Sequence, residues 1–129
     1  MCGIVGFVNN KENKEKIIKD MSKKIEHRGP DGEGFYIDDN CALAHRRLAI
    51  IDLNTGAQPI YNEDKSKVII YNGEVYNFKE LKEALLKKKH IFKTKTDTEV
   101  ILHGYEQWGE KLPNHLRGMF SFAIWDKNK

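Results

Sequence analysis

The sequence predicts an α+β protein in which antiparallel sheets are layered against helices. Strand-like runs come first and recur along the chain, whereas helix-like segments fall in separated blocks. The strict alternation of strand and helix that builds a parallel doubly wound sheet is missing. The 129 residues fit one domain, residues 1–129. The 40% hydrophobic and 32% charged residues form the balance of a globular chain with a buried core.

Strands are predicted where short apolar runs rich in β-branched residues are bounded by turn residues. The first run, Gly3–Val8, is followed by two asparagines. The others cover Gly34–Ile37, Cys41–Ala44, Leu48–Leu53, Val68–Tyr71, Ile91–Thr94 and Met119–Trp125. An Asn-Gly pair, Asn72-Gly73, suggests a tight turn or hairpin after the fifth run.

Three helices are predicted from apolar residues at helical spacing. The first covers roughly Lys14–Glu26. The second and third start with the capping boxes Asn77-x-x-Glu80 and Thr96-x-x-Glu99, and the third stops at Gly109.

Composition and charge exclude several function classes. The net charge is only +3, and the lysines are scattered along helix-like stretches, so we expect no nucleic-acid partner. The first apolar run is too short to span a bilayer, so we expect no membrane. Two cysteines without a secretory signal indicate a reduced, cytoplasmic protein. The five histidines lack metal-ligand spacing, so no metal site is predicted.

Cys2 is the first candidate for chemistry because it follows the initiator methionine. Removal of Met1 would leave a thiol and a free α-amine on one residue, whereas a retained Met1 would block this arrangement. The amine has an ordinary pKa of about 7.7–8.0, so near neutral pH it can act as the base for the thiol. Position alone favours the alternative that Cys2 is a small buried hydrophobe at a strand edge.

Other candidates each have a structural alternative. Arg46 and Arg47 stand at the mouth of an apolar strand, where an arginine fork binds a carboxylate or forms a surface salt bridge. Asn72 and Gly73 offer an amide and a backbone N–H for an oxyanion, or form a plain turn. Asp97 could pair with an ammonium group, or simply favour the start of its helix.

Seven segments, in this order and spacing, resemble the N-terminal-nucleophile (Ntn) glutamine amidotransferases over the whole chain. Each segment is weak alone, but the set is highly specific. The segments are Met1–Gly6, His27–Asp31, Arg47–Asp52, Gly56–Ile60, Tyr71–Asn77, Asp97–Ile101 and Leu116–Phe120. Within this family, His27–Asp31, Ala57–Pro59 and Asn72–Asn77 are most similar to asparagine synthetases. The resemblance implies an αββα sandwich of two antiparallel sheets between helix layers.

The resemblance also implies the catalytic roles. Cys2 attacks the side-chain amide of glutamine and forms a γ-glutamyl thioester, while its own amine handles the protons. The Asn72 side chain and the Gly73 N–H form the oxyanion hole.

Substrate binding, on the same resemblance, involves charges remote from the reacting amide, which supply orientation and specificity. Arg47 holds the α-carboxylate of glutamine. Asp97, with help from the Glu74 region, holds the α-ammonium, and the backbone around Ile51 lines the pocket.

Full asparagine synthetases carry a second domain that uses ATP and Mg²⁺, and its Ser-Gly-Gly-x-Asp-Ser loop does not occur in this sequence. We therefore expect a glutaminase portion, incomplete at the C-terminus and without a cofactor of its own. In the full-length protein it would supply ammonia for asparagine synthesis from aspartate and ATP. Expected partners are glutamine, the C-terminal synthetase domain and, because an uncovered sheet edge invites association, a second copy in a homodimer.

Two alternatives to this expectation stay open. The same glutaminase chemistry could serve another amidotransferase acceptor, or the chain could be a non-catalytic folded fragment.

Overall fold

The computed structural model describes residues 2–10, 12–48 and 57–129. Two three-stranded antiparallel sheets form the centre of the molecule, with strand orders β1-β3-β2 and β4-β5-β6. The strands are β1 Gly3–Val8, β2 Gly32–Ile37, β3 Cys41–Arg47, β4 Ile60–Tyr61, β5 Lys67–Val75 and β6 Gly118–Asp126. The helices are α1 Lys14–Lys24, α2 Phe78–Lys87 and α3 Asp97–Trp108, with 3-10 helices η1 Glu26–Arg28 and η2 Gly109–His115.

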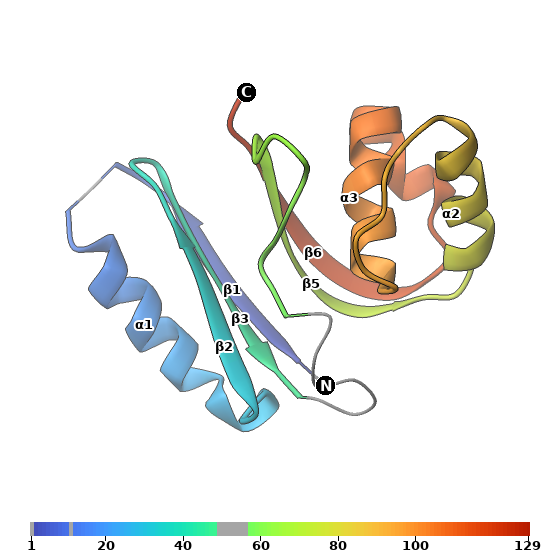
Figure 1. The fold of residues 1–129 in the computed structure, drawn as a ribbon. Helices are drawn as coiled ribbons and strands as arrows, with labels where there is room; N and C mark the ends of the chain where they lie inside the picture. The colour runs from blue at the N-terminus through green and yellow to red at the C-terminus, as the bar shows by residue number, and fades with distance from the viewer. Residues whose placement is uncertain (1, 11, 49–56) are drawn as a thin grey trace.

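The elements stack in four layers (Figure 1). Helix α1 covers the outer face of the first sheet, and α2 and α3 cover the outer face of the second, so the two sheets face each other. The predicted α+β sandwich of two antiparallel sheets between helix layers is confirmed.

Each interface between layers has its own apolar core. Beneath α1 the core is small and centres on Ile18, Ala42 and Ala44. Between the sheets, buried side chains from both sheets meet: Tyr36, Cys41, Leu43, Val68 and Ile70. The largest core lies between the second sheet and its helices: Ile69, Tyr71, Val75, Leu81, Leu85, Val100, Ile101, Leu102, Leu112 and Leu116.

These cores follow from the alternation of side chains along each strand. In β5, Val68 and Ile70 point toward the other sheet, whereas Ile69 and Tyr71 point toward the helices. Continuing the same alternation puts Asn72 on the inter-sheet face and Val75 on the helix face, where Val75 is buried. The strand thus presents different side chains to the two layers.

Two polar links join the sheets. Trp125 Nε1 in β6 donates to Asp38 Oδ2 in the β2–β3 turn at 2.7 Å, and the Tyr36 hydroxyl donates to the same oxygen at 2.6 Å. At the other end of β3, His45 Nε2 donates to the Tyr71 carbonyl in β5 at 3.1 Å. The His45–Tyr71 bond fixes how β3 sits against β5, close to the residues predicted to carry chemistry.

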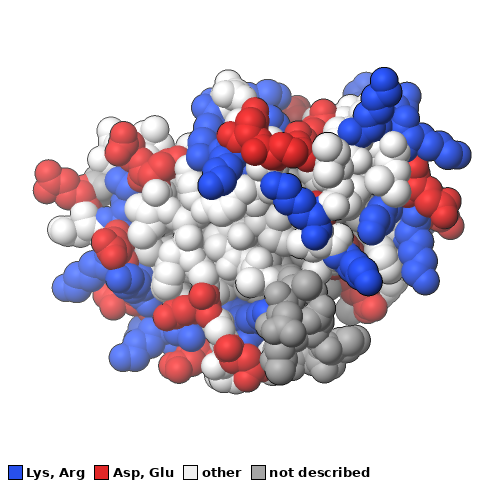
Figure 2. Space-filling view, in the orientation of Figure 1, with Lys and Arg blue, Asp and Glu red and all other residues white. Residues whose placement is uncertain are grey.

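The charged surface matches the scatter seen in the sequence. On the face drawn in Figure 2, Lys and Arg alternate with Asp and Glu around an uncharged central area. In the part of the chain that the structure describes, no helix has both the length and the apolar character needed to cross a membrane.

Several strand predictions need correction. Ile91–Thr94 is irregular, because the N–H groups of Lys93 and Thr94 donate to the Glu99 carboxylate instead of to a neighbouring strand. Strand β3 runs on to Arg47, and Leu48 lies outside a strand. The rest of the predicted strand Leu48–Leu53 lies outside the described residues. The short strand β4 had no clear signal in the sequence.

The predicted turn at Asn72-Gly73 is wrong. Both residues lie inside β5, where Asn72 pairs with Ser121 and Gly73 pairs with Phe120 of β6. The reason is a long-range pairing, since β6 is far away in sequence and continues past this point to Gly118.

The helix starts are correctly placed, but the capping boxes are wrong. Asn77 and Thr96 occupy the N-cap positions without a side-chain capping bond. The Asn77 amide instead accepts from the Arg117 N–H at 3.0 Å and donates to the His115 carbonyl at 2.9 Å. The first helix ends at Lys24, slightly earlier than predicted.

Candidate active site

Cys2 lies just before β1, where the first sheet ends. Its Sγ accepts a hydrogen bond from the Leu48 N–H at 3.4 Å and lies 3.9 Å from the Leu48 carbonyl oxygen. The last β1–β3 pair is Gly3 with Arg46, so continuing the register places Cys2 opposite Arg47. Cys2 is half-buried, and the Leu48 backbone holds its thiol.

The His27–Asp31 loop closes over this end of the sheet. Arg28 Nε donates to the Cys2 carbonyl at 3.1 Å, which anchors the nucleophile candidate by its main chain. A Cβ on Gly29 would come within 2.4 Å of the Arg46 backbone, so only glycine allows this approach. The Asp31 N–H donates to the Arg47 carbonyl at 3.0 Å.

The two neighbouring arginines face opposite layers. Arg46 points toward α1, where its Nη2 pairs with Glu33 at 3.1 Å and its Nε donates to Ser22 Oγ at 3.0 Å. Arg46 therefore forms a structural salt bridge, the alternative role considered for these arginines. Arg47 shares the face of His45, which is the inter-sheet face, and it is half-buried. Of the two, Arg47 is the arginine on the inter-sheet face.

Asn72, Gly73 and Glu74 follow one another in β5 at the end of the inter-sheet core. Asn72 is half-buried and Glu74 is exposed. Gly73 has φ +144°, and a Cβ there would lie 2.3 Å from the Met119 carbonyl oxygen. The strand therefore demands glycine at this position.

Asp97 reaches β5 from the first turn of α3. Its Oδ2 accepts from the Tyr71 hydroxyl at 2.6 Å and from the Val75 N–H at 3.0 Å. Asp97 thus bonds β5 on both sides of Asn72, Gly73 and Glu74. Its carboxylate approaches that segment from the helix layer, while Cys2 and Arg47 lie on the first sheet.

The structure brings most predicted site residues to one end of the sandwich. Strand β1 contacts β5, and the His45–Tyr71 bond joins β3 to β5 immediately before Asn72. Two residues along a strand cover roughly 7 Å, so Arg47 lies within a short reach of this joint. Ile51, predicted to line the pocket, and Met1 lie outside the described residues.

This arrangement suits acyl transfer. A thiol lies at the end of the first sheet, an amide side chain and a glycine follow one another in β5 of the second, and Arg47 and Asp97 add a cation and a carboxylate. Residues 1–129, the whole chain, match the glutamine amidotransferase domain family. The chain belongs to this family. The amidotransferase domain therefore has the nucleophile, oxyanion and charge-binding candidates at the same end of its two sheets.

Curated relatives are similar in sequence over nearly the whole chain. Asparagine synthetase (glutamine-hydrolyzing) 2 of Bacillus subtilis (strain 168) is 48% identical over 134 residues, covering 100% of this chain and 18% of the relative. The asparagine synthetase (glutamine-hydrolyzing) of Zea mays is 49% identical over 129 residues, covering 98% of this chain and 22% of the relative. The amidotransferase domain thus spans about a fifth of the length of these relatives.

A solved structure confirms the fold. The glutamine phosphoribosylpyrophosphate (PRPP) amidotransferase from B. subtilis, in complex with ADP and GMP, superposes with a TM-score of 0.73 at 21% identity. The match covers 98% of this chain and 35% of the other. The two-sheet sandwich expected from the family resemblance is therefore the architecture of the amidotransferase domain.

A second polar cluster lies away from this site, on α3. His103 is buried, and its ring nitrogens bond to Glu106 Oε1 at 2.6 Å and Glu99 Oε2 at 3.0 Å. Burial opposes the charged ring, but the two carboxylates outweigh burial and raise the pKa of His103 to about 9. Ligand atoms of His90, His103 and Glu106 lie within 4.8 Å of one another, although their spacing gave no metal signal. Because carboxylates engage both His103 nitrogens, hydrogen bonding of an imidazolium accounts for this cluster.

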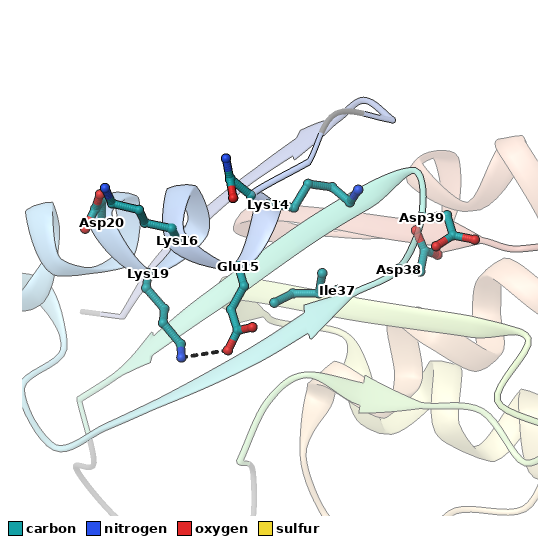
Figure 3. A pocket seen from close by; sticks show the side chains of 9 residues that line it. Lys14, Glu15, Lys16, Lys19, Asp20, Ile37, Asp38 and Asp39 are labelled. Atoms are coloured by element: carbon teal, nitrogen blue, oxygen red, sulfur yellow. Dashed lines mark hydrogen bonds and ion pairs between the residues drawn. The ribbon is translucent and has the colours of Figure 1, made fainter.

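A shallow depression near the start of α1 has a different character (Figure 3). Its lining is mostly charged, and Glu15 and Lys19 pair across one helical turn at 2.8 Å. The hydrogen bond and charge of Lys19 lower the pKa of Glu15, although both groups are exposed. None of the predicted site residues lines this depression.

Sequence reasoning missed several residues that build the site. Arg28 belongs to the family segment His27–Asp31 but had no predicted role, and the structure shows that it holds the Cys2 carbonyl. Tyr71 looked like the end of an apolar strand, yet its hydroxyl binds Asp97. His45 and Gln58 both bond the main chain of Tyr71, and no local pattern indicates such contacts.

Proposed function

We propose that residues 1–129 form a glutamine-hydrolysing domain that supplies ammonia for asparagine synthesis. One observation carries the proposal: Cys2 and Arg47 end one sheet, and Asn72 and Gly73 lie on the facing sheet beside the His45–Tyr71 joint. The identity of 48–49% to glutamine-hydrolyzing asparagine synthetases supports asparagine synthesis as the purpose of the ammonia.

The proposed chemistry is acyl transfer through a thioester. With Met1 removed, the Cys2 amine takes the thiol proton, and Sγ attacks the side-chain carbonyl carbon of glutamine. The Asn72 amide and the Gly73 N–H stabilise the oxyanion. The amine then passes the proton to the leaving nitrogen, and ammonia departs. Water hydrolyses the γ-glutamyl thioester to glutamate and restores the thiol.

Substrate binding uses the two α-charges of glutamine. The Arg47 guanidinium is proposed to bind the α-carboxylate, and its inter-sheet orientation supports that role. Asp97, with Glu74 nearby, is proposed to bind the α-ammonium, and Ile51 is proposed to line the pocket. These contacts lie far from the reacting amide, so they contribute orientation and specificity.

The full-length protein is proposed to pass ammonia to a C-terminal synthetase domain. That domain would use ATP and Mg²⁺, whereas the described residues of this chain are proposed to act without a cofactor. Cys2 and Cys41 are both free thiols, which supports a reducing cytoplasm. The homodimer stays a prediction, and sedimentation of the protein measures it.

The nucleophile assignment is tested by combining intact mass with active-site labelling. Intact mass reports whether Met1 has been removed. The glutamine analogue 6-diazo-5-oxo-L-norleucine is then expected to label Cys2, and peptide mapping locates the adduct. Cys41 is the internal control, because it is buried and burial raises the pKa of its thiol to about 11.

The possible results separate the alternatives. Labelling at Cys2, lost in Cys2→Ala, supports the thioester mechanism. A processed chain that binds glutamine but stays unlabelled would refute the nucleophile. A chain that neither binds nor is labelled would instead be a non-catalytic fragment.

A further inference from the structure

Tyr71 makes three hydrogen bonds next to the proposed oxyanion residues. The residue is 4% exposed, and its hydroxyl donates to Asp97 Oδ2 at 2.6 Å. The same oxygen accepts the Val75 N–H at 3.0 Å. One carboxylate oxygen is therefore held from two directions, and together the two bonds span residues 72–74.

The main chain of Tyr71 is fixed separately from its hydroxyl. Its N–H donates to Gln58 Oε1 at 2.6 Å, and its carbonyl accepts from His45 Nε2 at 3.1 Å. That carbonyl belongs to the peptide group that leads into Asn72. Removal of the hydroxyl alone would therefore leave Asp97 with only the Val75 N–H bond to β5 and keep the Asn72 backbone in place.

The Tyr71 hydroxyl is suited to act as a permanent hydrogen-bond donor to the Asp97 carboxylate. Burial, and then the hydrogen bond to Asp97, raise the pKa of Tyr71 far above neutral pH, so the hydroxyl keeps its proton. A hydroxyl bound to a carboxylate forms a short, charge-assisted bond that restricts rotation of the carboxylate.

We propose that Tyr71 is a positioning residue for glutamine, whose hydroxyl fixes the Asp97 carboxylate in the orientation that receives the α-ammonium. This inference rests on the role proposed above for Asp97. In this role Tyr71 does not contact the reacting amide of glutamine. It acts only through the Asp97 carboxylate.

A purely structural role is the competing explanation, since Tyr71 also belongs to the core beneath α3. A matched control lies at the opposite end of the two sheets. The Tyr36 hydroxyl donates to Asp38 Oδ2 at 2.6 Å, and that oxygen likewise accepts a second donor, Trp125 Nε1 at 2.7 Å. Tyr36→Phe thus removes the same kind of bond away from the site.

The test compares steady-state glutamine hydrolysis by the wild-type protein, Tyr71→Phe and Tyr36→Phe, with thermal unfolding measured in parallel. For Tyr71→Phe we expect KM for glutamine to rise roughly 10-fold, as for loss of a hydrogen bond to a charged group, while kcat stays within about 2-fold. For Tyr36→Phe we expect a similar fall in stability with KM unchanged.

A double-mutant cycle adds an independent reading. If Tyr71 acts through Asp97, then Tyr71→Phe has little further effect on kcat/KM once Asp97→Ala is present. Additive losses, or an unchanged KM in Tyr71→Phe, would overturn the inference. A wild-type protein that fails to hydrolyse glutamine would instead remove the proposed function, and with it this inference.

Discussion

The two faces of β5 differ in what they contribute. Toward the helices, Ile69, Tyr71 and Val75 are at most 4% exposed and belong to the largest core of the protein. Toward the other sheet, Ile70 is buried, but Asn72 is half-buried and Glu74 is exposed. One strand therefore serves stability on one side and the proposed chemistry at the end of the other.

The difference shows why the proposed site lies where it does. A polar side chain buried without partners costs free energy, so Asn72 cannot sit deep in the inter-sheet core. At the end of that core it meets both the rigid sheet and an approaching ligand. The rigidity comes from the helix-facing side, where packing holds the strand in place.

Gly73→Ala is expected to have the largest effect, because it should disturb both the packing of β5 and the proposed oxyanion site. A Cβ there would lie 2.3 Å from the Met119 carbonyl oxygen and 2.5 Å from Phe120 Cα, at φ +144°. We expect the free energy of unfolding to fall by at least about 3 kcal/mol, together with loss of glutaminase activity. Chemical denaturation and a coupled glutamate assay measure the two. A fully stable variant would show that the β5–β6 pairing adjusts.

Ile69→Ala should weaken only the packing of β5 against the helices. The side chain is completely buried, so its truncation is expected to lower the free energy of unfolding by about 2–5 kcal/mol. Activity per folded molecule should stay within about twofold. Ile69→Val, with an expected cost of about 0.5–1.5 kcal/mol, serves as the graded control in urea denaturation. A loss of kcat in excess of unfolding would contradict the separation of the two faces.

Asn72→Ala should impair only the proposed chemistry on the face of β5 that points toward the other sheet. Loss of one oxyanion donor lowers turnover by about 10²–10³-fold, whereas the unfolding midpoint should hardly change. Ser121→Ala is the matched control, since Ser121 pairs directly with Asn72 in β6 and is exposed. Equal losses of activity in the two variants would argue against a specific role for the amide.

The smallest expected effect is a pH dependence that originates between the sheets. Burial, opposed by the hydrogen bond to the Tyr71 carbonyl and assisted by nearby Arg47, lowers the pKa of His45 to about 4 from its ordinary value of 6.5. The unfolded chain takes up a proton near pH 6.5, whereas the folded protein does so only near pH 4. Stability is therefore full above pH 6.5 and falls as the pH drops toward 4, by at most about 3 kcal/mol.

His45→Gln isolates this contribution. The difference in unfolding free energy between the wild type and this variant should shrink as the pH falls from 7 to 4. A constant difference over that range would show that His45 does not titrate in this window.

Part of the fold was predictable because its signals are local. The apolar run Gly3–Val8 and the helical spacing after Asn13, Asn77 and Thr96 placed these elements closely. Predictions failed where a distant group competed. Glu99 accepts the backbone N–H groups of Lys93 and Thr94 that a strand would have used, and pairing with β6 keeps Asn72 and Gly73 in an extended strand.

The sequence by itself determined the family, the chemical types of the candidate residues and the places of the three helices and most strands. Only the tertiary structure decided that Arg46 faces Glu33 while Arg47 faces the other sheet, and that Asp97 is held by Tyr71. The physical reason is distance along the chain. Periodicity and turn preference act over a few residues, whereas strand pairing and sheet packing join residues far apart and choose the face that each side chain occupies.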